Sequence, residues 1–79
     1  MTQEYVLDEL KAIIKQINPK TDTDSITPDT RLVEDLGLDS LTMLLMSFAI
    51  EKKFGIMFDV ARKFDTVNEV IEFVRLKAL

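Results

Sequence analysis

The sequence predicts an all-α protein, a small four-helix bundle with three longer helices, one short helix and a long first loop. Hydrophobic residues make up 47% of the 79 residues and charged residues 30%, which is typical of a folded domain rather than a disordered chain. Two glycines and two prolines leave little material for a turn-rich β protein. A chain of this length forms one domain, which we assign to residues 1–79.

The first helix is expected from about Thr2 to Ile17, where apolar residues recur at helical spacing. They form one stripe, as in a helix that packs one face against a core. The stripe consists of Val6, Leu10, Ile13 and Ile17, with Leu7 and Ile14 at its edge. Asn18-Pro19 ends the helix, because proline cannot continue the backbone hydrogen bonds.

The next stretch, residues 18–39, is rich in Thr, Asp, Pro and Lys and predicts a long loop. Isolated apolar residues within it are expected to anchor the loop to the core. They are Ile26, Leu32, Val33, Leu36 and Leu38. One helical turn is expected around Pro28 to Arg31, since proline is favoured at the first position of a helix.

The second long helix is predicted to start at Ser40 and to end near Phe54. Gly37 permits a backbone turn that a side chain hinders, and Asp39 and Ser40 are both residue types that are preferred at a helix N-cap. Gly55 suits the left-handed position that follows a helix C-terminus. Ser40 is therefore expected at the start of a helix.

This second helix has two apolar stripes on nearly opposite sides when its residues are placed at about 100° each. One stripe contains Met43, Met46, Ile50 and Phe54, and the other contains Leu41, Leu44, Leu45 and Phe48. A chain this short cannot easily bury both sides. We expect the first stripe in the core and the second exposed to a partner or ligand beside Ser40.

The last third of the chain predicts two more helices. A short one is expected to open near Asp59. Thr66 and Glu69 then have the spacing of a capping box at the start of the last helix. The apolar stripe of that helix consists of Val67, Val70, Ile71 and Val74.

Missing residue types exclude several classes of function. With no Cys and no His, the chain cannot form a disulfide, a Cys/His zinc site, a thiolate nucleophile or a Ser-His dyad. Ser40 has no evident base, so we predict no catalytic residue, no metal site and no enzymatic activity. The net charge of −4 disfavours nucleic acid as a partner, because affinity for phosphates comes mainly from Lys and Arg.

Membrane insertion is not expected either. No apolar run approaches the length of a membrane span, and the first residues lack the basic and apolar regions of a secretory signal. The predicted location is the cytoplasm.

The residues around Ser40 form a longer motif, Glu34-Asp35-Leu36-Gly37-Leu38-Asp39-Ser40-Leu41. This motif, followed by a helix in a small acidic chain, resembles the attachment motif of acyl carrier proteins. The resemblance covers essentially the whole chain and implies the family's four-helix bundle. It also implies that Ser40 carries a covalent 4′-phosphopantetheine and that Asp39 helps to present the serine to a phosphopantetheinyl transferase, with Leu41 completing the attachment site.

In this family, the thiol of the arm holds acyl groups as thioesters, and the bundle shelters the acyl chain between its helices. The resemblance therefore implies a non-catalytic carrier that delivers acyl intermediates to acyl-transferring and chain-elongating enzymes. These enzymes would belong to fatty-acid, polyketide or related lipid biosynthesis. A monomer is expected.

The sequence departs from the housekeeping fatty-acid carriers on its expected docking surface. Those carriers usually have acids two and five positions after the serine, where this chain has Thr42 and Leu45. Basic residues follow, namely Lys52, Lys53, Arg62 and Lys63, and of the acids only Glu51 and Asp59 clearly remain. We expect partners to bind Leu44, Leu45, Phe48, Glu51 and Asp59. Since surface charges decide partner choice, this pattern favours a carrier dedicated to a specialised pathway.

Two alternatives remain open at this point. The first is a carrier of aminoacyl groups, because peptidyl and D-alanyl carriers share the fold and the modified serine. The second is a helical protein-interaction module without a prosthetic group, whose exposed apolar stripe simply binds another protein.

Overall fold

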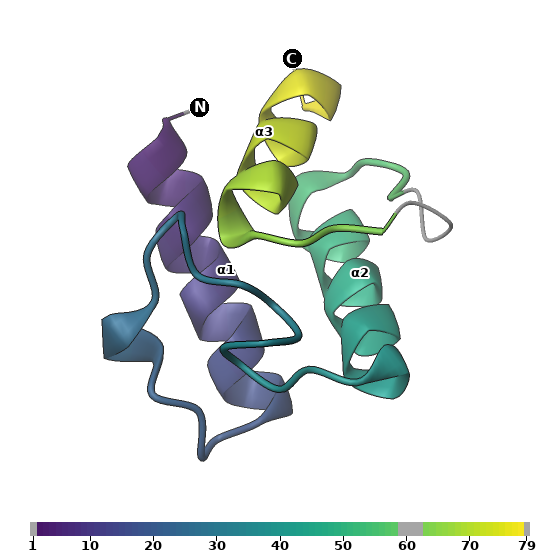
Figure 1. Ribbon diagram of the computed structural model, residues 1–79. Coiled ribbons are helices and arrows are strands. Elements are labelled where there is room, and N and C mark those ends of the chain that lie inside the picture. The colour runs from purple at the N-terminus through teal and green to yellow at the C-terminus, as the bar shows by residue number, and fades with distance from the viewer. Residues whose placement is uncertain (1, 59–62, 79) are drawn as a thin grey trace.

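The computed structural model describes residues 2–58 and 63–78, and the fold of these residues is helical, with no strand among them. Its elements are α1 (Gln3–Ile17), the short 3-10 helix η1 (Thr23–Ser25), α2 (Ser40–Phe54) and α3 (Val67–Lys77). The first helix, α1, contacts both α2 and α3 (Figure 1). The predicted all-α class and the three longer helices are thus confirmed. The short helix predicted near Asp59 lies outside the described residues.

Side-chain caps fix where α1 and α3 begin. At α1, the Thr2 hydroxyl accepts a hydrogen bond from the Tyr5 N–H at 3.1 Å. At α3, the Thr66 hydroxyl accepts one from the Glu69 N–H at 3.3 Å, as the capping-box spacing predicts. The Glu69 carboxylate turns back one residue further than in a standard capping box and accepts from the Asp65 N–H at 2.6 Å. These caps satisfy N–H groups that the first turn of a helix leaves free.

The core lies where the apolar stripes of the helices meet. Residues that are almost fully buried include Val6, Leu10, Ile14, Met46, Ile50, Val67, Val70, Ile71 and Val74. The stripe predicted for α3 is therefore confirmed. In α1, Ile14 is buried and Ile17 is half-buried, so Ile14 belongs to the buried stripe and Ile17 to its edge, the reverse of the prediction. Three phenylalanines, Phe58, Phe64 and Phe73, add a cluster of rings with centroids 5.1 to 5.5 Å apart.

The long loop between α1 and α2 is attached to the core as expected, with two corrections. Ile26, Leu32 and Leu38 are buried, whereas the predicted anchor Val33 is 57% exposed. The helical turn predicted at Pro28 to Arg31 is wrong. The short helix of the loop is η1, and near Pro28 the chain forms only a turn, in which the Thr30 N–H donates to the Thr27 carbonyl at 3.0 Å.

Backbone hydrogen bonds join this loop to the segment that enters α3. The Leu32 N–H donates to the Asp65 carbonyl at 2.8 Å, and the Val67 N–H donates to the Thr30 carbonyl at 2.9 Å. The Arg31 guanidinium also hydrogen-bonds the Asp65 carboxylate. Since buried backbone groups need partners, these bonds explain how a long loop with little regular structure is held against the core. We call these hydrogen bonds between residues 30–32 and residues 65–67 the loop strap.

Gly37 and Gly55 are expected to resist substitution because both have positive φ, 68° and 66°. Open space surrounds the position where a Cβ would lie at either glycine, so the cost comes from backbone strain and not from a clash. We expect Gly55→Ala to lower the free energy of unfolding by about 1 to 2 kcal/mol. Urea unfolding measures this change. Gly55→Asn is the control and should cost less, since Asn tolerates the left-handed conformation; equal costs would contradict the explanation.

Candidate functional site

The site begins with the capped start of α2. Asp39 is the N-cap in extended backbone conformation, and its carboxylate accepts a hydrogen bond from the Thr42 N–H at 2.8 Å. The Asp39 carbonyl accepts from the Met43 N–H at 2.9 Å. Ser40 is thus the first residue of the helix, as predicted. The cap fixes the start of the helix and so places Ser40 at the positive end of the helix dipole.

The hydrogen bond from the Thr42 N–H, reinforced by the Thr42 hydroxyl, holds the pKa of Asp39 below its ordinary value of 3.8. A lowered folded-state pKa means that the carboxylate contributes stability above the unfolded pKa. This contribution is lost as the pH falls through the folded pKa.

We therefore predict that Asp39→Asn, which keeps an N-cap oxygen but removes the charge, lowers stability at pH 7. The difference in free energy of unfolding from the wild type should stay constant above about pH 5 and shrink as the wild-type carboxylate becomes protonated. Urea unfolding from pH 7 down to pH 3 measures it. Asp29→Asn, at an exposed loop acid, is the control. A difference that persists unchanged at pH 3 would show that the charge of Asp39 is not involved.

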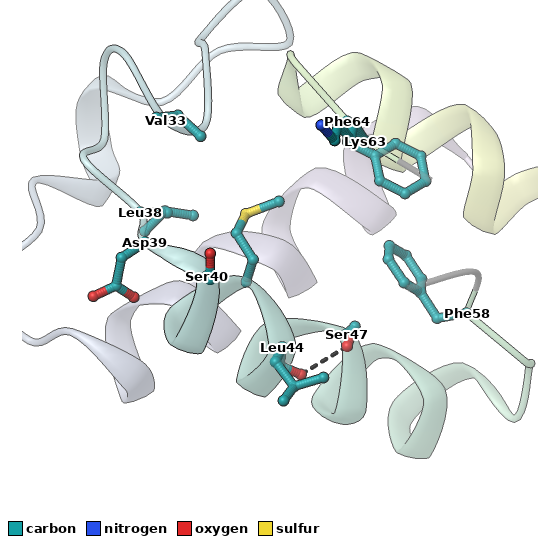
Figure 2. A pocket seen from close by; sticks show the side chains of 10 residues that line it. Val33, Leu38, Asp39, Ser40, Leu44, Ser47, Phe58, Lys63 and Phe64 are labelled. Atoms are coloured by element: carbon teal, nitrogen blue, oxygen red, sulfur yellow. Dashed lines mark hydrogen bonds between the residues drawn. The ribbon is translucent and has the colours of Figure 1, made fainter. Parts of the chain in front are cut away.

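A cavity of about 700 Å³ opens beside Ser40. It lies between α2, the end of the long loop and the segments around Phe58 and Phe64 (Figure 2). The lining residues are Val33, Leu38, Asp39, Ser40, Met43, Leu44, Ser47, Phe58, Lys63 and Phe64. The α2 members stand at positions i, i+3, i+4 and i+7 from Ser40, so one face of the helix forms the wall. The mostly apolar lining suits a hydrophobic ligand.

The surroundings of the Ser40 side chain are open. Its side chain is exposed, and within residues 2–58 and 63–78 no other side chain hydrogen-bonds its hydroxyl. Figure 2 shows the Asp39 carboxylate directed away from the cavity. Among the described residues, no hydrogen bond joins the Asp39 carboxylate to the Ser40 hydroxyl.

The division of α2 into two stripes is confirmed. Met46 and Ile50 are buried, and Met43 and Phe54 are half-buried against the core. The opposite side chains are between 39% and 64% exposed, namely Leu41, Leu44, Leu45 and Phe48. We call these four residues the outer stripe. Leu44 also borders the cavity, so the outer stripe reaches the edge of the site.

Of the two acids predicted to contact partners, the structure describes Glu51. Glu51 is half-buried, and its carboxylate accepts a hydrogen bond from the Phe58 N–H at 2.8 Å, so it also fixes the segment that leaves α2. Asp59 lies outside the described residues, as does Arg62. Among the basic residues, Lys53 pairs with Glu9 at 3.4 Å and Lys52 is exposed.

Several cavity residues were not singled out from the sequence. Met43 was assigned only to the core, and Phe58, Phe64 and Ser47 had no assigned role. Phe58 and Phe64 reach the cavity through long-range folding that no local pattern reports. Ser47 carried a detectable signal, since it is a polar residue two helical turns after Ser40 in an otherwise apolar segment.

The described residues contain no group of three or more His, Cys, Asp or Glu side chains arranged to hold a metal ion. Of the helices described, none combines the length and the apolar character needed to cross a bilayer.

The amino-acid sequence matches known proteins over most of its length. A family profile described as "Phosphopantetheine attachment site" matches residues 8–74. The acyl carrier protein of Thermosynechococcus vestitus is 32% identical over 79 residues, covering 98% of this chain and 96% of that protein. The acyl carrier protein of Desulforapulum autotrophicum is 36% identical over 72 residues, covering 89% and 94%. The acyl carrier protein AcpXL of Brucella melitensis is 40% identical over 62 residues, covering 78% and 66%.

Proposed function

The chain belongs to the acyl carrier protein family, and from that premise we propose that Ser40 is the residue to which its 4′-phosphopantetheine is attached. The protein is a non-catalytic carrier with this covalent cofactor. The observation that carries the assignment is the position of Ser40, an exposed serine that starts α2 and borders a cavity of about 700 Å³. We assign Asp39 and Leu41, its neighbours in the motif, to the same attachment site.

The residues around Ser40 fit the group. Attachment through a phosphate diester places a negative charge at the N-terminus of α2, where the helix dipole and free N–H groups stabilise it. When attached, the arm supplies the thiol that this Cys-free chain lacks, and acyl groups are held on it as thioesters. The chain itself presents the hydroxyl through the Asp39 cap and offers the apolar walls of Met43, Phe58 and Phe64 to the cargo.

Mass spectrometry tests this proposal. The apo protein, incubated with coenzyme A and a broad-specificity phosphopantetheinyl transferase, should gain the mass of one phosphopantetheinyl group. Fragmentation of the product should place that mass on Ser40. No gain of mass would contradict the carrier function, and the protein-interaction module would then be the remaining alternative. Loading of the holo protein by aminoacyl-transferring enzymes but not by acyl-transferring ones would make it an aminoacyl carrier.

We further propose that the carrier serves a specialised route of fatty-acid, polyketide or related lipid biosynthesis, with the outer stripe as its docking surface for partner enzymes. The support is the exposure of Leu44, Leu45 and Phe48 beside the site. Thr42 and Leu45 stand where housekeeping carriers usually have acids, so a partner with an apolar surface fits this side of α2 better than a strongly basic one.

Leu45→Glu is expected to change docking without changing the fold. Leu45 is exposed, so the free energy of unfolding should stay within about 0.5 kcal/mol of the wild type. Loading by enzymes with basic carrier-binding surfaces should become faster, because the added carboxylate attracts them. Transfer rates measured at low and physiological salt check this. Gln16→Glu, which adds the same charge on α1, is the control, and an equal gain for both variants would contradict a role for the outer stripe.

A further inference from the structure

Ser47 lies on α2 where it can contact a group that is attached at Ser40. The two residues are seven positions apart, so at about 100° per residue their side chains project from nearly the same face of the helix. At about 1.5 Å of rise per residue they are separated by roughly 10 Å along the helix axis. Both line the same cavity. A group that starts at Ser40 and lies along the cavity therefore passes Ser47.

Ser47 differs from the rest of the cavity wall. It is 2% exposed and is the one buried polar residue in the part of the chain that the structure describes. Its neighbours in the wall, including Met43, Phe58 and Phe64, are apolar. An alkyl chain in the cavity offers no donor to the lone pairs of this oxygen, so a wall built only to hold an alkyl chain has no need of a hydroxyl.

The hydrogen bonding of Ser47 determines what its oxygen can offer. The Ser47 hydroxyl donates its proton to the Leu44 carbonyl at 2.7 Å, within the helix (Figure 2). A serine hydroxyl has one proton to donate and two lone pairs that accept. With the proton used, the cavity offers an acceptor and no further donor at this point.

We propose, on the basis of the proposed function, that the Ser47 hydroxyl accepts a hydrogen bond from the loaded arm. The ligand chemistry is a neutral N–H or O–H donor, since a buried ion without a counter-charge is costly. Two sources supply such a donor: an amide N–H of the arm and a hydroxyl on the acyl cargo. This contact favours an arm or cargo that, when it occupies the cavity, has its N–H or O–H donor next to the Ser47 oxygen.

The test compares the wild type with Ser47→Ala in three forms: holo protein, protein loaded with an alkanoyl group, and protein loaded with a 3-hydroxyalkanoyl group of the same chain length. Mass spectrometry first confirms each loading step, so a failure of attachment at Ser40 is recognised separately. The readouts are the rate at which hydroxylamine cleaves the thioester and, for the holo form, the rate of thiol alkylation. Both rates rise when the arm leaves the cavity.

One hydrogen bond predicts that Ser47→Ala raises these rates by about 2- to 10-fold. An increase confined to the 3-hydroxyalkanoyl form identifies the cargo hydroxyl as the donor. An increase in all three forms identifies an amide of the arm. Equal rates for wild type and Ser47→Ala in every form would overturn the proposal and leave the hydroxyl as an internal contact of the helix.

The control is Ser25→Ala, because the Ser25 hydroxyl also donates to the carbonyl three residues earlier, that of Asp22, at 2.9 Å, but lies outside the cavity lining. Its rates should equal those of the wild type. If Ser25→Ala accelerates cleavage as much as Ser47→Ala, the effect does not come from the cavity wall and the proposal fails. Ser47→Ala itself is expected to fold, because alanine has the highest helix propensity, and thermal melting of the apo proteins verifies this.

Discussion

Ser40→Ala is expected to abolish attachment of 4′-phosphopantetheine completely while leaving the fold intact. The hydroxyl of Ser40 is the proposed nucleophile, and alanine has no atom that can replace it. The side chain is exposed and makes no hydrogen bond within the described residues, so its loss removes no contact of the fold. Alanine is also well suited to the first turn of a helix. Mass spectrometry after incubation with coenzyme A and transferase measures attachment, and thermal melting measures the fold.

Ser25→Ala is the matched control for this experiment. Ser25 is an exposed serine in η1, and its variant should be modified to the same extent as the wild type. A gain of mass in Ser40→Ala would place the attachment at another residue and contradict the assignment. A variant that failed to melt cooperatively would instead point to a structural role for the Ser40 hydroxyl.

Ile50→Ala is expected to cause a large loss of stability. Ile50 is 0% exposed in the core stripe of α2, and truncation to alanine removes buried apolar surface and leaves a cavity. Such substitutions cost about 2 to 5 kcal/mol. The total free energy of unfolding of natural domains is only about 5 to 15 kcal/mol, and a 79-residue chain lies toward the lower end. We therefore expect a large fraction of the variant to be unfolded at physiological temperature.

Leu45→Ala provides the comparison for Ile50→Ala on the same helix. Leu45 is 44% exposed, so its truncation should change the free energy of unfolding much less than that of Ile50. Urea unfolding of the two variants under one set of conditions measures the difference. Equal losses would mean that the core and outer stripes of α2 are exchanged, and the docking surface proposed on the outer stripe would then be wrong.

The helices were predictable because their information is local. Apolar spacing and caps such as Asp39 and Thr66 lie within a few residues of the structure that they determine. The two stripes of α2 were also predictable, since a helix has a fixed angular repeat and a small domain can bury only one side. Ser40 is proposed as the attachment residue because of its place in a motif, which is again a local feature of the sequence.

The errors in the long loop have a different origin. Val33 has the same apolar character as Leu32, yet only Leu32 is buried, because the backbone bond from Leu32 to Asp65 decides which side chain faces inward. That partner is 33 positions away in the chain, and no local pattern reports it. The same holds for Phe58 and Phe64, which enter the cavity wall through contacts between distant segments.

The loop strap has a mechanical consequence for the cavity. The Leu32 N–H donates a hydrogen bond to the Asp65 carbonyl. The adjacent residues, Val33 after Leu32 and Phe64 before Asp65, both line the cavity. These two walls therefore form one rigid edge, because separating them requires breaking backbone hydrogen bonds. We therefore expect a bulkier group in the cavity to be accommodated by changes of side-chain rotamer on α2 or at Phe58, more readily than by movement of Val33 away from Phe64.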